Sequence, residues 1–131
     1  MSTGLIVTND TGWITPELST NFELFNESSY VRYRRVGDIV TISGQVTPTA
    51  TITADNNTYR IFSIPSNCCP NHLLVIPCQG SSQYIWCCIV SKYGTVAFWR
   101  YRRGSSAADC PAGAWLPFDC SFMVGGYLWS D

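Results

Sequence analysis

The alternation of apolar and polar residues is most regular between residues 30 and 46, which read "YVRYRRVGDIVTISGQV". Successive side chains of a β-strand point to opposite faces of a sheet, so such alternation predicts strands with one buried face. Gly37 and Asp38 interrupt the pattern, and a glycine at the first position of a two-residue connection is typical of a hairpin turn. This stretch therefore predicts two antiparallel strands joined by a tight turn.

The alternation also predicts which side chains face the core. In the first strand, Val31, Tyr33 and Arg35 share one face. The inner row of the second strand is formed by its β-branched apolar residues, Val40, Ile42 and Val46. Gly44 falls in the same inner row, where a glycine marks either a bulge or a close approach of another backbone segment.

Further β-rich runs follow, separated by clusters of Gly, Pro, Asn and Ser. They cover residues 59–64, 72–79, 83–90, 95–103 and 118–129. The run at 83–90 is apolar at successive positions and predicts a strand buried on both faces, while Pro77 places its own run at a sheet edge or bulge. Because no segment repeats apolar residues at helical spacing, the sequence predicts an all-β fold, a compact antiparallel β-barrel or jelly-roll-like sandwich.

The 131 residues are expected to form a single domain. Within it, residues 1–29 are predicted to be an N-terminal arm or strand packed on the head, and residues 30–131 the β-barrel head. Residues 104–117 are expected to be a long loop.

Composition narrows the possible functions. Charged residues make up 13% of the chain, against about 25% in typical proteins, and apolar residues make up 46%. Identical chains commonly cover excess apolar surface, so a homo-oligomer is expected. The net charge of −1 provides no basic field for nucleic acid. No apolar run approaches the about 18 residues of a membrane span, and the N-terminus lacks the pattern of a secretion signal.

The seven cysteines are odd in number and include two adjacent pairs, which is a poor framework for disulfides. There is no CxxC motif and His72 is the only histidine, so neither a metal site nor a cofactor is expected. Free, buried thiols in a protein made in a reducing cytosol are the better interpretation.

No sequence motif of an enzyme is present, and no enzymatic activity is expected. A pair of carboxylates such as Asp109 and Asp119 is the remaining alternative, because glycosidases use two carboxyl groups across a cleft.

Ligand binding is better supported, because aromatic residues reach 14% of the chain. Aromatic rings pack on the flat C–H faces of sugars, and arginine forks suit carboxylate or phosphate groups. The candidate ligand-binding residues combine these groups: Trp86, Trp99, Arg100, Tyr101, Arg102, Asp109 and Trp115. The alternative is that the tryptophans fill the core or an oligomer interface.

The arginine-rich strand is interpreted first as a solvated outer face formed by Arg32, Arg34 and Arg35. In an oligomer these side chains would instead pair with acidic residues of a neighbour, such as Glu23 or Glu27.

Several stretches resemble the C-terminal modules of phage tail structural proteins: "DTGWI", "YVRYRRVGDIVTISGQVTPT" and "FSIPSNCCPNHLLVIPC". The later part, with "IPSNCCPN" and "GSSQYIWCCIVSKYGTVAFW", is similar to the head domain of receptor-binding proteins from lactococcal siphophages. The likeness covers about residues 12–129.

The resemblance implies a parallel homotrimeric head at a phage tail tip or baseplate, assembled in the host cytoplasm. Such a head recognises a host cell-surface saccharide and contacts other tail proteins. The alternative is a purely structural virion protein, a tail, baseplate or capsid-decorating knob that binds other virion proteins.

The sequence departs from the family at the binding strand. Lactococcal heads carry a Trp and a His-x-Asp pair there, whereas this chain has Gln83, Cys87 and Ile89 at the corresponding positions. Either the saccharide site has moved, toward Arg100 and Trp115, or this strand is an interface and the receptor differs.

Overall fold

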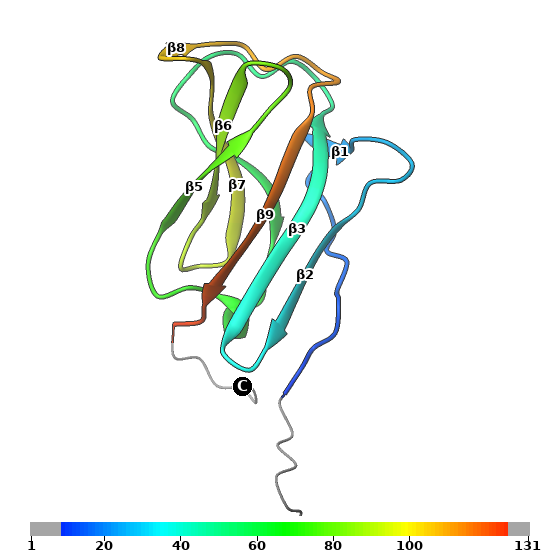
Figure 1. Cartoon of the computed structure of the whole chain (residues 1–131), viewed down its shortest axis with the longest axis vertical. Helices are drawn as coiled ribbons and strands as arrows, with labels where there is room; N and C mark the ends of the chain where they lie inside the picture. The colour runs from blue at the N-terminus through cyan, green and yellow to red at the C-terminus, as the bar shows by residue number, and fades with distance from the viewer. Residues whose placement is uncertain (1–8, 126–131) are drawn as a thin grey trace, which may run out of the picture.

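The computed structural model describes residues 9–125, which form two antiparallel β-sheets packed on each other (Figure 1). The first sheet contains β1 (Phe22–Leu24), β2 (Val31–Val36), β3 (Ile39–Pro48) and β9 (Leu116–Met123). The second contains β4 (Tyr59–Ser63), β5 (Leu74–Gln79), β6 (Tyr84–Val90), β7 (Thr95–Arg103) and β8 (Ser106–Ala107). A single 3-10 turn, η1 (Ser66–Cys68), interrupts the described strands. The all-β prediction is confirmed, as a sandwich and not a closed barrel, since no strand pairing within residues 9–125 joins the two sheets.

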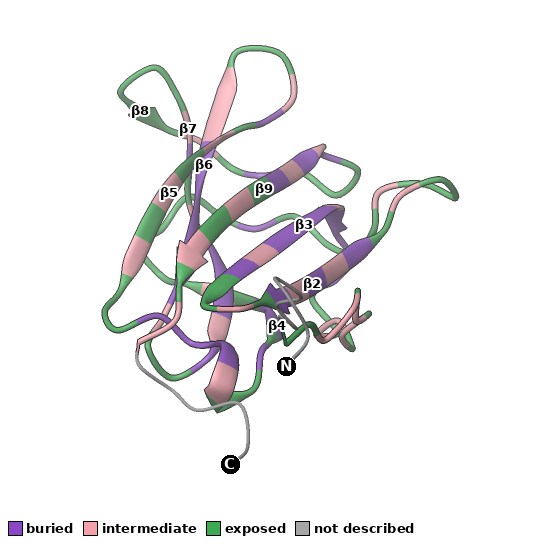
Figure 2. Ribbon diagram, turned by 60° about the horizontal axis from the view of Figure 1, so that its bottom comes forward, coloured by how far each residue is buried: buried purple, intermediate pink, exposed green. Residues whose placement is uncertain are grey.

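The hairpin predicted from the alternating pattern is β2 and β3. Val36 pairs with Ile39, which leaves Gly37 and Asp38 as the two-residue turn, and Gly37 has a φ of +58°. The predicted inner row of β3 is also confirmed, because Val40 and Ile42 are both 0% exposed. Buried and intermediate residues alternate along β2, as Figure 2 shows, whereas most residues of β3 are buried.

Gly44 permits a close approach between segments. A Cβ atom at this position would lie 2.7 Å from the Tyr30 carbonyl oxygen and 2.9 Å from the ring of Phe118. No side chain fits in that space, so the glycine lets β3 pack against both neighbours, as its place in the inner row predicted.

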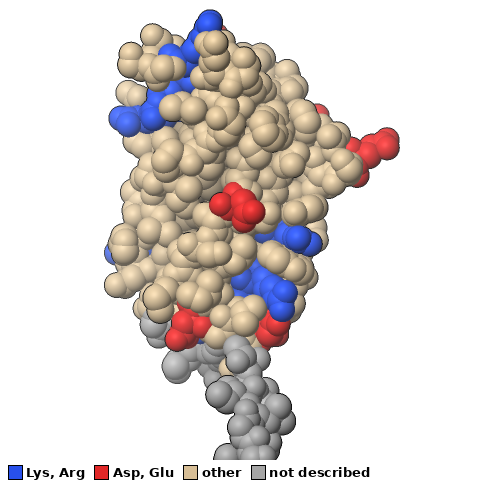
Figure 3. Space-filling model, viewed as in Figure 1, with Lys and Arg blue, Asp and Glu red and all other residues tan. Residues whose placement is uncertain are grey.

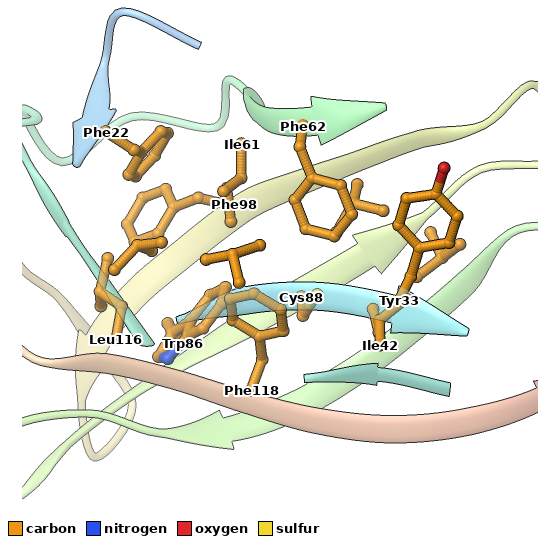
Figure 4. Close-up of a cluster of buried hydrophobic side chains, with 14 of the residues drawn as sticks. Phe22, Tyr33, Ile42, Ile61, Phe62, Trp86, Cys88, Phe98, Leu116 and Phe118 are labelled. Carbon is orange, nitrogen blue, oxygen red and sulfur yellow. The ribbon is translucent and has the colours of Figure 1, made fainter. Parts of the chain in front are cut away.

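The core lies between the two sheets and is rich in aromatic rings (Figure 4). The Trp86 ring of β6 stacks on Phe98 of β7, with 5.7 Å between ring centroids. Trp86 also meets Phe118 of β9 edge-on, at 6.3 Å, so a single indole connects the two sheets. Such aromatic contacts add to the stabilisation from burying the rings.

Strand β6 is buried on both faces, as predicted. Cys88 and Val90 point into the core between the sheets. Cys87 and Ile89 point the other way, outside that core cluster, and are nevertheless only 5% and 9% exposed. The strand lies between β5 and β7, and β5, which carries Pro77, is an edge strand as expected.

The N-terminal segment runs along the outer edge of β2. Asp10 bridges to Val36 and Ile14 to Tyr33, after which β1 pairs with the end of β3. The part of the predicted arm at residues 1–8, and the end of the predicted 118–129 strand from residue 126, lie outside the described residues.

The long loop expected at residues 104–117 is partly regular structure. Residues 106–107 form β8, which extends a hairpin from β7, and β9 already begins at Leu116. The sequence pattern predicted a later start, at residue 118, because Pro117 precedes it and proline is unusual inside a sheet. It is accommodated here because β9 is paired on one side only, with β3.

The interpretation of the arginine-rich strand as a solvated outer face is wrong for Arg35. Its side chain is 1% exposed, whereas the Arg34 side chain is 35% exposed and pairs with Asp10. Arg35 donates hydrogen bonds to the backbone oxygens of Gly37 (2.8 Å) and Asn67 (2.6 Å). It is therefore a buried structural cation and not part of a solvated face.

The seven cysteines are free, and five of them are buried. Burial raises the pKa of Cys78 to about 11 and those of Cys110 and Cys120 to about 12. These thiols stay protonated near neutral pH and act as small apolar groups, as the sequence suggested.

Candidate functional site

Strand β7 changes its path beside β6, and this change sets up the candidate site. The pairing register shifts between Ile85 and Cys87, which is the mark of a β-bulge. Opposite the shift, Arg100 has a backbone φ of +57°, in the left-handed region that residues other than glycine seldom adopt. Bulges redirect side chains and are frequent beside functional sites.

A groove of about 580 Å³ lies beside this bulge. Its lining comes from three segments, the loop before β4, the end of β7 and the hairpin that follows: Asp55, Asn56, Arg100, Tyr101, Arg102, Gly104, Ser105 and Ala107. The volume is within the range of about 300–1,000 Å³ typical of small-molecule sites.

Trp99 supports the groove from the side of β7. Its indole Nε1 donates a hydrogen bond to the Asn56 carbonyl oxygen (3.1 Å), which ties the loop before β4 to the sheet. The Arg100 guanidinium lies 4.1 Å from the centre of the same ring, a cation–π contact. Trp99 thus holds both Arg100 and the opposite wall of the groove in place.

Asp55 organises the loop on the opposite wall. Its carboxylate accepts hydrogen bonds from the Tyr59 hydroxyl (2.7 Å) and from the Asn57 backbone N–H (2.9 Å). Both bonds favour the ionised form, so the pKa of Asp55 is lowered, with the Tyr59 hydroxyl as the main cause. The carboxylate is therefore already engaged within its own loop.

The arginines of the groove have no such engagement. Among the described residues, the side chains of Arg100 and Arg102 form no hydrogen bond or ion pair, while the Arg103 side chain donates to Gln83 (2.9 Å). Figure 3 shows basic side chains gathered at this end of the molecule. The groove therefore offers two guanidinium groups to an incoming anion.

Tyr101 contributes little open surface. It is 5% exposed and stacks on Tyr84, with 4.9 Å between ring centroids. Burial raises the pKa of Tyr101 to about 12, so the phenol is neutral at physiological pH. It is therefore a largely buried member of the groove lining.

The other candidate residues lie elsewhere. Trp86 is 0% exposed and its Nε1 donates to the Gln79 carbonyl oxygen, so the prediction that it binds a ligand is wrong. Asp109 accepts the backbone N–H of Ala54 (2.8 Å) and so braces the loop behind the groove. Trp115 does not line this groove; its Nε1 donates to the Gln45 side chain (3.2 Å).

Of the three residues compared from the sequence at 83–89, only Gln83 is exposed. Cys87 and Ile89 are buried, and Gln83 accepts the hydrogen bond from Arg103. The alternative carboxylate pair is also divided, because Asp119 lines a different groove from the loop that Asp109 holds.

Sequence reasoning missed the wall formed by Asp55 and Asn56. The stretch "ADNNT" is a turn signal, and an Asp side chain bonding two residues ahead was predictable from it. Its position beside β7 depends on the pairing of β4 with β7, a long-range contact that no local pattern encodes.

No protein-family model matches the chain, and no curated protein matches its sequence. Within residues 9–125, no helix is long and apolar enough to cross a membrane, and no group of three or more His, Cys, Asp or Glu side chains is placed to hold a metal ion.

Proposed function

We propose that this protein is the receptor-binding head of a phage tail or baseplate, and that it binds an anionic host cell-surface saccharide without catalysing a reaction. The observation that carries the proposal is the groove in which Arg100 and Arg102 have no acidic partner. Two planar donor forks suit a carboxylate or phosphate group of a glycan. The Trp99 ring under Arg100 keeps one fork oriented before the ligand arrives.

The phage assignment rests on the resemblance of the "YVRYRRVGDIVTISGQV" hairpin and the segments after it to phage tail modules. The β2–β3 hairpin has the geometry that this motif implies, with a glycine-first turn and one buried face. The head would belong to the virion, at the tail tip or baseplate, after assembly in the host cytoplasm.

Replacing both groove arginines, in Arg100→Ala with Arg102→Ala, should lower adsorption to host cells or binding to their isolated anionic glycan at least tenfold. Each charge-assisted hydrogen bond contributes about 1.5–3 kcal/mol, and about 1.4 kcal/mol corresponds to a factor of ten. Binding is measured by surface plasmon resonance on immobilised glycan, and circular dichroism checks the fold.

The matched control is Arg60→Ala, an exposed arginine of the same sheet outside this groove. It should leave binding unchanged. Equal losses of binding free energy per removed charge in the control and the double variant would mean that the arginines act only through the net charge of the protein. Unchanged binding in the double variant would reject the groove as the site.

We also propose that the head is a homotrimer. Support comes from apolar side chains exposed on and beside the second sheet, including Leu73 (54%), Val75 (45%) and Tyr93 (82%). An identical chain that covers exposed apolar side chains would be stabilised by their burial. Light scattering on the purified protein should give a mass near three times the 14.6 kDa of one chain, and a stable monomer at micromolar concentration would reject the proposal.

The rival proposal is a structural virion protein, and the same apolar residues favour it, because they also suit contacts with other virion proteins. Failure to bind any intact host cell, combined with tight binding to a purified baseplate or capsid protein, would support the rival.

A further inference from the structure

A second groove, of about 410 Å³, lies on the other sheet and has different chemistry. Outward-facing residues of β3 and β9 contribute to it, with the loop before β2 on one side and the edge strand β5 on the other. Ser43 of β3 pairs with Asp119 of β9, and Gln45 of β3 pairs with Pro117 of β9. These four residues therefore form two neighbouring cross-strand pairs on the same face of the sheet. The surface over β9 and β3 is mostly neutral, with an isolated acidic group near the middle of the view, while basic side chains appear on the β2 side (Figure 3).

Two glutamine side chains in this groove have fixed orientations. The Gln45 Oε1 atom accepts the Trp115 indole N–H (3.2 Å), which leaves the Gln45 amide N–H groups as donors. The Gln79 Nε2 atom donates to the carbonyl oxygens of Ser82 (2.8 Å) and Gly80 (3.0 Å), which leaves Gln79 Oε1 as an acceptor. The groove therefore presents one oriented amide donor and one oriented amide acceptor.

Asp119 supplies the ionised group. Its carboxylate is exposed and forms no hydrogen bond or ion pair within residues 9–125. No other lining residue is charged. A carboxylate with two free oxygens accepts two neighbouring hydroxyl groups and disfavours a second anion. The Tyr30 ring, which is 46% exposed, borders the same groove and provides an aromatic surface.

We propose that this groove binds one neutral pyranose unit, with Asp119 and Gln79 accepting hydrogen bonds from ring hydroxyls and the Gln45 amide donating to a hydroxyl oxygen. Each sugar hydroxyl both donates and accepts, which matches the mixed set of oriented groups. The proposal is independent of the Arg100 groove, because the two grooves share no lining residue and the second is proposed to bind a neutral ligand instead of an anion.

The test uses the full chain labelled with nitrogen-15 and titrated with the methyl glycopyranosides of glucose, galactose and mannose. Glucosamine and glucuronate serve as cationic and anionic comparisons. At least one neutral glycoside should shift the backbone amide signals of Ser43, Gln79 and Asp119 in a saturable manner. Asp119→Asn should weaken this binding roughly tenfold or more, because hydrogen bonds to a charged group are lost while the shape is kept.

Glu23→Gln is the matched control, an exposed carboxylate of the same sheet outside the groove, and should leave the affinity unchanged. The proposal is overturned if no neutral glycoside shifts these amides, if Asp119→Asn binds as well as the unmodified chain, or if only glucosamine binds. Shifts confined to residues around Arg100 would also overturn it, while leaving the proposed anionic site intact.

Discussion

Replacing Ile42 with Asp is expected to abolish folding. Ile42 is 0% exposed on the inner row of β3, where it pairs with Tyr33 of β2 and Cys120 of β9. A carboxylate at this position would be buried without a partner, and burying such a group costs several kcal/mol even when it becomes protonated. The total stability of a domain is about 5–15 kcal/mol, so the loss is a large share of it. Near-ultraviolet circular dichroism and urea denaturation measure the outcome.

The neighbouring residue provides the control. Thr41 points to the opposite face of β3, where its hydroxyl lies 2.7 Å from that of Ser121 and its cross-strand partner is Arg34. Thr41→Asp should fold, since the new charge faces solvent beside a cation. If Ile42→Asp keeps a cooperative transition at an unchanged urea midpoint, the assignment of the buried row is wrong.

The faces of β3 were predictable because they depend on a local property. Side chains alternate with a period of two, so the positions of Val40 and Ile42 in the sequence decide their burial in any sheet. The same holds for the turn at Gly37, whose positive φ is a requirement of the turn itself. The arrangement of the strands into two sheets, with β9 beside β3, required pairings between distant segments, and the local pattern contains no information on these.

The candidate site was predictable only in part, for the same reason. The cluster of Trp99, Arg100 and Arg102 is contiguous in the sequence, and the structure keeps Arg100 and Arg102 together on one groove. Trp86 was misassigned because a tryptophan in an apolar strand fits a core position and a binding surface equally well until the opposing sheet is known. Trp115 lies on the chain near the cluster but serves the other sheet, where it orients Gln45.

For Arg35, the alternating pattern and the charge of the side chain lead to conflicting predictions. The alternation placed it on the same face as Val31 and Tyr33, whereas its charge suggested a solvated position beside Arg32 and Arg34. The structure agrees with the alternation, and Arg35 is 1% exposed. Its burial is possible because the guanidinium meets the Gly37 carbonyl oxygen and the Asp38 carboxylate of the turn and the Asn67 carbonyl oxygen of η1. Only the contact with Asn67 depends on the tertiary structure.

Replacing Arg35 with Ala is therefore expected to lower the free energy of unfolding by about 3 kcal/mol or more. The change removes the hydrogen bonds from Arg35 to the Gly37 and Asn67 carbonyl oxygens and the ion pair with Asp38, and it opens a cavity. A hydrogen bond from a charged group contributes about 1.5–3 kcal/mol. Urea denaturation of the purified variants measures the loss.

Arg34→Ala is the matched control, since it removes the same side chain from the adjacent residue on the exposed face of β2, where its partner is Asp10. It should change the urea midpoint little. Arg35→Lys should lie between the two, because an ammonium group keeps the charge but lacks the fork that joins the turn to η1. Equal stability of the Arg34 and Arg35 alanine variants would mean that the buried hydrogen bonds do not hold η1 against the first sheet.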